Sequence, residues 1–121
     1  MNHVPVAINL KKQSRQLVLE YADGNTFTLS CELLRVYSPS AEVRGHGPGQ
    51  EVLQIGKENV NIDSIQPIGT YAVKLVFDDG HDSGLYTWDY LYDLGREAEQ
   101  LFAKYLTALK AAGHERKVQH D

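Results

Sequence analysis

The fold of this chain is decided by the stretch FDDGHDSGLYTWDYL, residues Phe77 to Leu91. Residues 71–77, rich in β-branched and aromatic side chains, lead into it and form the strongest strand pattern in the sequence. A polar turn over residues 78–83 follows, because Asp and Gly tolerate the backbone angles of tight turns. Residues 84–86 then favour a second strand, and the Thr87 hydroxyl suits the N-cap of a helix. The stretch therefore predicts a strand, a turn, a strand and the start of a helix.

The predicted helical region continues toward the C-terminus. Apolar residues recur at helical spacing over residues 98–112, which predicts an amphipathic helix with one apolar stripe. Gly95 interrupts or ends the first helical segment, and Gly113 ends the second. We expect the charged residues 114–121 to form a flexible tail. The pattern predicts a single domain, residues 1–113, followed by that tail.

Toward the N-terminus, apolar and polar residues alternate in short segments separated by polar turns. Residues 6–10, 17–21 and 26–29 predict antiparallel strands. Ser30 is a suitable N-cap for a short helix, which Pro39 stops. We therefore predict an α+β fold. It consists of a small antiparallel β-sheet, arranged as a meander, with the short helix and the C-terminal amphipathic helix packed on one face.

The middle of the chain is less regular. Residues 38–50 are polar and rich in Gly and Pro, which predicts a long loop, and ordered long loops are often functional. Residues 60–62 favour a short strand. Residues 65–68 are expected to supply apolar contacts near Pro67.

Composition and charge exclude several classes of protein. The chain has 12 Lys and Arg against 16 Asp and Glu, a net charge of −4, so we expect neither nucleic acid nor an anionic membrane as partner. No apolar run reaches membrane-spanning length, and the first residues lack the pattern of a signal peptide. A single cysteine, Cys31, allows neither an internal disulfide nor a multi-cysteine zinc site. We therefore expect a cytoplasmic protein.

The turn holds the most compact group of ionisable side chains, namely Asp78, Asp79, His81 and Asp82. They indicate either a weak metal or polar-ligand site, or a solvated turn whose carboxylates accept backbone hydrogen bonds. Cys31 begins the short helix, where it is either an activated thiol or a small buried apolar residue. Neither a nucleophile elbow nor a phosphate-binding loop is present in the sequence.

Four aromatic residues surround the predicted start of the C-terminal helix, Tyr86, Trp88, Tyr90 and Tyr92. They form either a recognition surface or the core beneath the helix. We expect Trp88 in the core. Tyr90 and Tyr92 flank Leu91 and cannot both share its face, so at least one of them should reach solvent or a partner.

Two segments, residues 33–43 and 79–91, resemble the gamma-butyrobetaine hydroxylase-like N-terminal domain family. The resemblance runs from about Val6 to about Leu94. This family, a domain of unknown function, occurs as stand-alone bacterial proteins, ahead of the catalytic domain of carnitine-pathway dioxygenases, and attached to P-loop ATPases of iron–sulfur cluster assembly. The resemblance implies a stand-alone, non-catalytic form of the domain, because 121 residues leave no room for the dioxygenase catalytic domain.

In those dioxygenases the similar module holds zinc with a Leu-Arg-x-x-Cys-x-Cys-x-x-Cys motif and a later His, and it helps to form the dimer. Leu34-Arg35 matches the start of this motif. The cysteine positions fall on Ser38, Ser40 and Val43, and the later His falls on His81. Two hydroxyls and an isopropyl group cannot replace three thiolates. We therefore expect no zinc and no other cofactor.

The resemblance implies a protein-interaction or dimerisation module, with a protein partner or self-association expected. We expect the loop 38–50 and the turn 79–84 to meet and to form the contact surface. The candidate residues are Arg35, Ser38, Ser40, Glu42, Arg44, His46, His81, Asp82, Ser83, Tyr86 and Trp88. Among them, a hydrogen-bond network would replace the metal, formed by Ser38, Ser40, Glu42, Arg44, His81 and Asp82.

Two alternatives stay open at this point. One is an accessory role in iron–sulfur cluster metabolism, which rests on the family's ATPase fusions alone. The other is a protein that weakly binds a metal or another ligand. A small enzyme ranks last, because no nucleophile or oxyanion donor is placed around the acidic cluster by the sequence.

Overall fold

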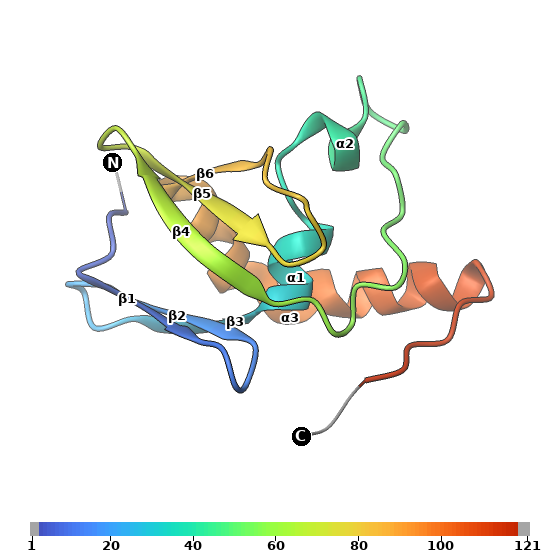
Figure 1. The fold of residues 1–121 in the computed structure, drawn as a ribbon, viewed down its shortest axis with the longest axis horizontal. Helices are drawn as coiled ribbons and strands as arrows, with labels where there is room; N and C mark the ends of the chain where they lie inside the picture. Colours follow the sequence, from blue (N-terminus) through green and yellow to red (C-terminus); the bar gives the residue numbers. More distant parts are fainter. Residues whose placement is uncertain (1–2, 119–121) are drawn as a thin grey trace.

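The computed structural model describes residues 3–118 and confirms the α+β class. The elements are β1 (Ala7–Lys11), β2 (Gln16–Glu20), β3 (Thr26–Ser30), α1 (Cys31–Val36), α2 (Ala41–Arg44), β4 (Ile62–Ile68), β5 (Ala72–Phe77), β6 (Leu85–Thr87) and α3 (Trp88–Ala111). The strands divide into two antiparallel sheets of three, in the orders β1-β2-β3 and β4-β5-β6, where the sequence suggested one meander (Figure 1).

The first sheet follows the predicted alternation. In β2 the side chains of Leu17 and Leu19 are buried, and they lie opposite Leu29 and Phe27 of β3 in the antiparallel register. Strand β1 pairs with the other edge of β2, with Ile8 opposite Leu19. Period-two burial therefore places one face of this sheet against the core.

The second sheet contains a longer strand than the pattern indicated. Residues 62–68 form one strand, β4, although the sequence suggested a strand at residues 60–62 and separate apolar contacts at residues 65–68. Pro67 lies within β4, opposite Val73. Strand β4 lies at the edge of its sheet and pairs with β5 alone. A proline, which has no N–H group, can therefore lie in it without removing hydrogen bonds to a strand on the other side.

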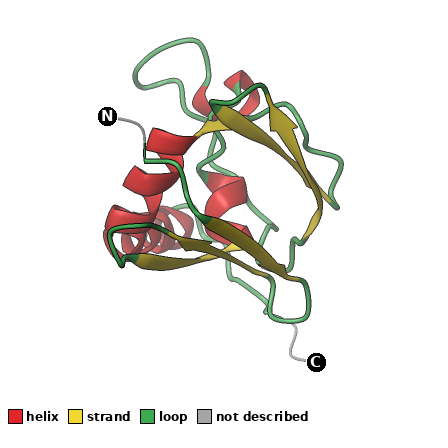
Figure 2. Ribbon diagram, turned by 90° about the vertical axis from the view of Figure 1, so that its left-hand side faces the viewer, coloured by secondary structure: helices red, strands yellow, loops and turns green. Residues whose placement is uncertain are grey.

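Helix α1 lies between the two sheets (Figures 1 and 2). As predicted, Ser30 is its N-cap, and the Leu33 amide donates to the Ser30 hydroxyl over 3.0 Å. All of its residues are buried. Leu34 of α1, Leu29 of β3 and Leu75 of β5 belong to the same hydrophobic cluster, so one core joins both sheets.

Helix α3 runs through Gly95 without a break, where the sequence allowed an interruption. A Cβ atom at Gly95 would lie 2.3 Å from Cδ2 of Phe27, so the absence of a side chain lets the helix pack closely against the first sheet. The Thr87 N-cap is confirmed, because the Tyr90 amide donates to its hydroxyl over 3.1 Å. Tertiary packing therefore outweighs the low helix propensity of glycine at this position.

The described part of the segment that follows α3 makes contacts with the domain. Arg116 forms a bidentate ion pair with Glu32 of α1. The Lys117 amide donates to the Glu58 carboxylate over 2.8 Å, and the Asn59 side chain donates to the Lys117 carbonyl. The remaining residues of the predicted tail, 119–121, lie outside the described residues. None of the helices within residues 3–118 is long and apolar enough to cross a membrane.

The Gly95–Phe27 contact predicts that Gly95→Ala lowers the stability of the domain, whereas the same change within a helix ordinarily raises it. Gly95→Ala should gain about 1 kcal/mol of helix propensity. It should lose about 1–3 kcal/mol because the Phe27 ring must move. We therefore expect a net decrease in the free energy of unfolding, measured by urea titration followed by circular dichroism.

The matched control is the same substitution in a Phe27→Ala background. There the ring is absent and only the Cβ of residue 27, 2.9 Å away, stays close, so Gly95→Ala should destabilise the domain by less than in the unmodified chain. An increase in stability from Gly95→Ala in the unmodified chain would contradict the close packing described here.

Candidate functional site

The turn between β5 and β6 folds as predicted and points His81 inward. The Phe77 amide donates to the His81 carbonyl over 3.0 Å, and the Gly80 amide donates to the Phe77 carbonyl over 3.2 Å. The His81 amide donates to the Asp79 carboxylate over 3.1 Å. His81 is only 5% exposed, so its ring belongs to the interior of the protein.

The chain segment opposite this turn follows helix α1. Pro39 prevents α1 from continuing, and Ser40 then caps helix α2, with the Glu42 amide donating to its hydroxyl over 3.2 Å. The predicted loop of residues 38–50 thus contains a single helical turn. That turn was missed because the segment is rich in Gly and Pro, although Ser40 and Glu42 give a local capping signal.

Three side-chain hydrogen bonds join these two segments, and we call this contact the seam. The Ser38 hydroxyl lies 2.8 Å from Nε2 of His81. On the other side of the ring, Nδ1 of His81 lies 2.9 Å from the Glu42 carboxylate. The Ser40 and Ser83 hydroxyls are 2.7 Å apart. The structure therefore brings together Ser38, Ser40, Glu42 and His81, four of the six residues of the expected network.

The other two residues of that network point elsewhere. The Arg44 guanidinium lies over the Tyr90 ring, 5.0 Å from its centroid. The Asp82 side chain is largely exposed, and its carboxylate lies 3.9 Å from the Lys74 ammonium. Both residues are adjacent to the seam in sequence but do not take part in it.

An ion cluster beside the seam fixes the base of the turn. Arg35 Nε lies 2.8 Å and Lys57 Nζ 2.6 Å from the same oxygen of Asp79. Burial raises the pKa of the Asp79 carboxyl, but hydrogen bonds from Lys57, the His81 amide and Arg35 outweigh that effect, and the pKa falls to about 2. Sequence reasoning missed Lys57, which is remote along the chain and carries no local motif.

Gly84 makes the close approach at the seam possible. A Cβ atom at this position would lie 2.3 Å from the Ser38 hydroxyl and 3.2 Å from Cδ of Pro39. Any larger residue would push the turn away from the segment after α1 and would lengthen the Ser38–His81 hydrogen bond.

Ser38, His81 and Glu42 are connected in the same order as a serine hydrolase triad, but the surroundings do not suit catalysis. Ser38 is only 1% exposed, and its hydroxyl also accepts the Ser40 amide over 3.3 Å. A hydroxyl this buried, bound to both the His81 ring and the Ser40 amide, is poorly placed to attack a substrate carbonyl. In this arrangement the three side chains connect two backbone segments.

Among residues 3–118, no group of three or more His, Cys, Asp or Glu residues is arranged so that it could hold a metal ion. Asp79 forms ion pairs with the Arg35 and Lys57 side chains, and the Asn61 backbone amide donates to the Asp78 carboxylate over 3.0 Å. Val43, at one family cysteine position, is a buried apolar residue. Of the two alternatives for this turn, the arrangement fits carboxylates that accept hydrogen bonds from the protein itself.

Cys31 is wholly buried. Desolvation raises the pKa of its thiol to about 11, although a backbone hydrogen bond acts in the opposite direction. The thiol is therefore protonated at neutral pH and unsuited to nucleophilic attack.

The aromatic residues divide between the core and a surface groove. Tyr86 is fully buried and donates to the Leu34 carbonyl over 2.6 Å. Trp88, which we expected in the core, is partly buried, and its indole N–H donates to the Thr70 carbonyl over 2.8 Å. Tyr92 packs between Phe27 and Tyr21.

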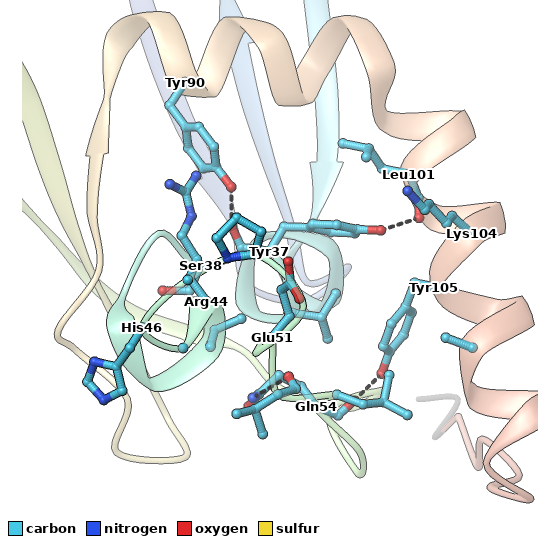
Figure 3. A pocket seen from close by; sticks show the side chains of 18 residues that line it. Tyr37, Ser38, Arg44, His46, Glu51, Gln54, Tyr90, Leu101, Lys104 and Tyr105 are labelled. Atoms are coloured by element: carbon cyan, nitrogen blue, oxygen red, sulfur yellow. Dashed lines mark hydrogen bonds between the residues drawn. The ribbon is translucent and has the colours of Figure 1, made fainter.

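The groove lies between the segment 43–54 and helix α3, and its volume is about 990 Å³ (Figure 3). Its lining includes Tyr37, Val43, Val52, Tyr90, Leu101 and Tyr105. Of the predicted contact residues, Ser38, Arg44 and His46 line it too. The groove was not predicted, because no local pattern places α3 against this loop.

Similar proteins of known structure share this fold. One NMR solution structure is 50% identical, with a TM-score of 0.84, and the match covers 100% of this chain and 95% of that one. A second NMR structure is 55% identical, with a TM-score of 0.81, covering 98% of this chain and 89% of that one. A crystal structure from Acidithiobacillus ferrooxidans is 38% identical, with a TM-score of 0.64, covering 76% of this chain and 92% of that one. It is described as a protein of unknown function in the DUF971 family.

A family model described as gamma-butyrobetaine hydroxylase-like, N-terminal, matches residues 8–92. These bounds begin inside β1, take in the seam and end inside α3. No functionally curated protein matches the chain.

The seam can be tested by removing its central ring. His81→Ala leaves the Ser38 hydroxyl without its ring partner and opens a cavity, so we expect a loss of about 1–3 kcal/mol in the free energy of unfolding. The amide NMR shifts of residues 38–44 should change as well. The matched control is His46→Ala, at an exposed histidine, which should leave both measurements unchanged. Equal behaviour of the two variants would contradict a structural role for the seam.

The Asp79 ion cluster makes the free energy of unfolding depend on pH. The folded-state pKa of about 2 lies below the ordinary value of 3.8, so the cluster stabilises the fold above pH 3.8 and loses that effect as the pH falls toward 2. We expect about 1–2 kcal/mol to be lost over this range, allowing for partial solvent exposure.

The check is urea unfolding as a function of pH for the unmodified chain and for Asp79→Asn. The variant should be less stable at neutral pH and should show a shallower slope in the acid range. Parallel pH profiles would show that Asp79 does not carry this effect.

Proposed function

This chain belongs to the gamma-butyrobetaine hydroxylase-like N-terminal domain family, and from that premise we propose that it is a non-catalytic protein-interaction module that works without zinc. The observation that carries the proposal is a run of exposed apolar side chains on the segment that follows the seam. Val52, Leu53 and Ile55 are 52%, 38% and 54% exposed. Apolar groups gathered on one ordered segment are typical of a surface that a partner covers.

The seam supports this proposal because it gives the exposed segment a fixed position without metal. In the dioxygenases that this chain resembles, zinc joins the two segments. Here the Ser38–His81 and Ser40–Ser83 hydrogen bonds join them. The polar groups with catalytic potential form hydrogen bonds within the protein, whereas the apolar side chains of Val52, Leu53 and Ile55 are exposed to solvent. That division fits binding better than chemistry.

Further bonds hold the exposed segment against the domain. The Val52 amide donates to the Val43 carbonyl over 2.8 Å, and Arg35 Nη1 donates to the Gln54 side chain over 3.0 Å. The Tyr105 hydroxyl donates to the Gln54 carbonyl over 2.7 Å. An ordered surface of this kind loses little conformational entropy on binding.

An accessory role in iron–sulfur cluster metabolism is the alternative, and it rests on family architecture. A cluster needs accessible thiolates, whereas Cys31 is wholly buried and its thiol pKa is raised. This counts against the chain holding a cluster, although it leaves docking on a cluster-assembly protein as one form of the proposed interaction. The single unpaired cysteine also supports a reducing compartment such as the cytosol.

The proposal predicts that binding depends on the exposed apolar pair. The tagged protein would be used for cross-linking capture in its host cells, and its self-association would be measured by sedimentation velocity. Val52→Asp combined with Leu53→Asp should weaken capture of the partner, or self-association, by about tenfold or more.

The matched control carries Val4→Asp and Val6→Asp, two apolar residues that are also exposed. This control variant should capture the partner, or self-associate, as the unmodified protein does. A monomer that captures no partner, or a partner lost equally in both variants, would contradict the proposed function.

A further inference from the structure

The groove beside the seam has walls that are tied to one another. The Tyr37 hydroxyl donates to the Leu101 carbonyl of α3 over 2.8 Å, and the Tyr90 hydroxyl donates to the Tyr37 carbonyl over 2.5 Å (Figure 3). Tyr105 makes the third such bond, to Gln54. Each hydroxyl is bound internally, so the rings present apolar surface to the groove. The cavity is therefore formed before any ligand arrives.

The charged groups of the groove are mainly cationic, although the chain as a whole has a net charge of −4. Arg44 and Lys104 lie toward opposite ends, with Glu51 between them (Figure 3). Within residues 3–118, neither cation forms an ion pair with a carboxylate, and Arg44 has only the Tyr90 ring as partner. These two cations are available to negative charges on a ligand, and they would attract an acidic ligand to the groove.

The combination of groups favours a peptide over a free fatty acid. Carboxylates at two places would match Arg44 and Lys104, whereas a fatty acid has a single carboxylate. Backbone amides of a peptide would supply donors for Glu51, which a fatty acid lacks. The exposed Val52 and Leu53 also extend the apolar surface over the rim of the groove, and a larger partner would cover them.

We propose that the groove binds a segment of a partner protein in which a bulky apolar side chain is flanked by acidic residues. The apolar side chain enters between Tyr37, Leu101 and Tyr105, and the flanking carboxylates pair with Arg44 and Lys104. This inference rests on the proposed function and names the chemistry of the partner.

The test uses the whole chain and a fluorescein-labelled peptide in which Leu-Trp is flanked on both sides by Asp and Glu. Binding is followed by fluorescence anisotropy, and its position by amide NMR shifts. We expect saturable binding, shifts at the groove residues and an affinity that falls with salt.

Arg44→Glu combined with Lys104→Glu should weaken binding of the acidic peptide by about tenfold or more. Lys11→Glu combined with Lys110→Glu is the matched control, because it makes the same change of charge at exposed lysines outside the groove, and it should bind normally. The NMR spectra of both double variants report whether each is folded. Equal losses in the two variants would overturn the proposal, since they would show attraction to overall charge alone.

Two further ligands complete the test. A peptide with Lys in place of the acidic residues, or with Gly-Ser in place of Leu-Trp, should bind weakly, and equal binding of either one would overturn the proposal. Binding of dodecanoate in the groove without binding of the acidic peptide would also overturn it. If Val52 and Leu53 control partner capture while the acidic peptide fails to bind, the interaction module stands and this account of its partner is wrong.

Discussion

The hydrogen bond of 2.8 Å between the Ser38 hydroxyl and the His81 ring is the contact on which the rest of this structure depends. It joins the segment after α1 to the turn between β5 and β6, which are remote in sequence. Both side chains are almost wholly buried, so water cannot replace the bond without opening the protein. Gly84 is required beside it, because a Cβ there would occupy the position of the Ser38 hydroxyl.

Several features of the surface follow from this contact. Once the segment after α1 is fixed, Ser40 can start helix α2, and the Val43 carbonyl is placed to accept the Val52 amide. That pairing, together with the anchoring of Gln54 by Arg35 and Tyr105, sets the outer wall of the groove. A buried polar contact thus determines the shape of an apolar surface some residues away. The segment that holds Ser38, Ser40 and Val43 is therefore ordered by contacts within the protein itself.

Most features governed by local chemistry could be predicted from the sequence, the Ser40 cap of α2 being an exception, whereas most features governed by distant neighbours could not. The caps at Ser30 and Thr87 were predicted because an N-cap bond involves residues a single turn apart. The continuity of α3 through Gly95 depends on Phe27, and the low pKa of Asp79 depends on Lys57 and Arg35, so neither has a local signal. The meeting of Ser38 with His81 was predicted only through the resemblance to a zinc-binding family. No sequence pattern predicted the groove, because it forms between helix α3 and the loop segment 43–54.

The most direct test of this account is amide hydrogen exchange, measured by NMR, in a Ser38→Ala variant. If the Ser38–His81 bond fixes the outer wall of the groove, the amides of Val43 and Val52 should lose protection, while those of Leu17 and Leu19 in the first sheet should keep it. Unchanged protection at Val43 and Val52, or a uniform loss throughout the domain, would contradict the account.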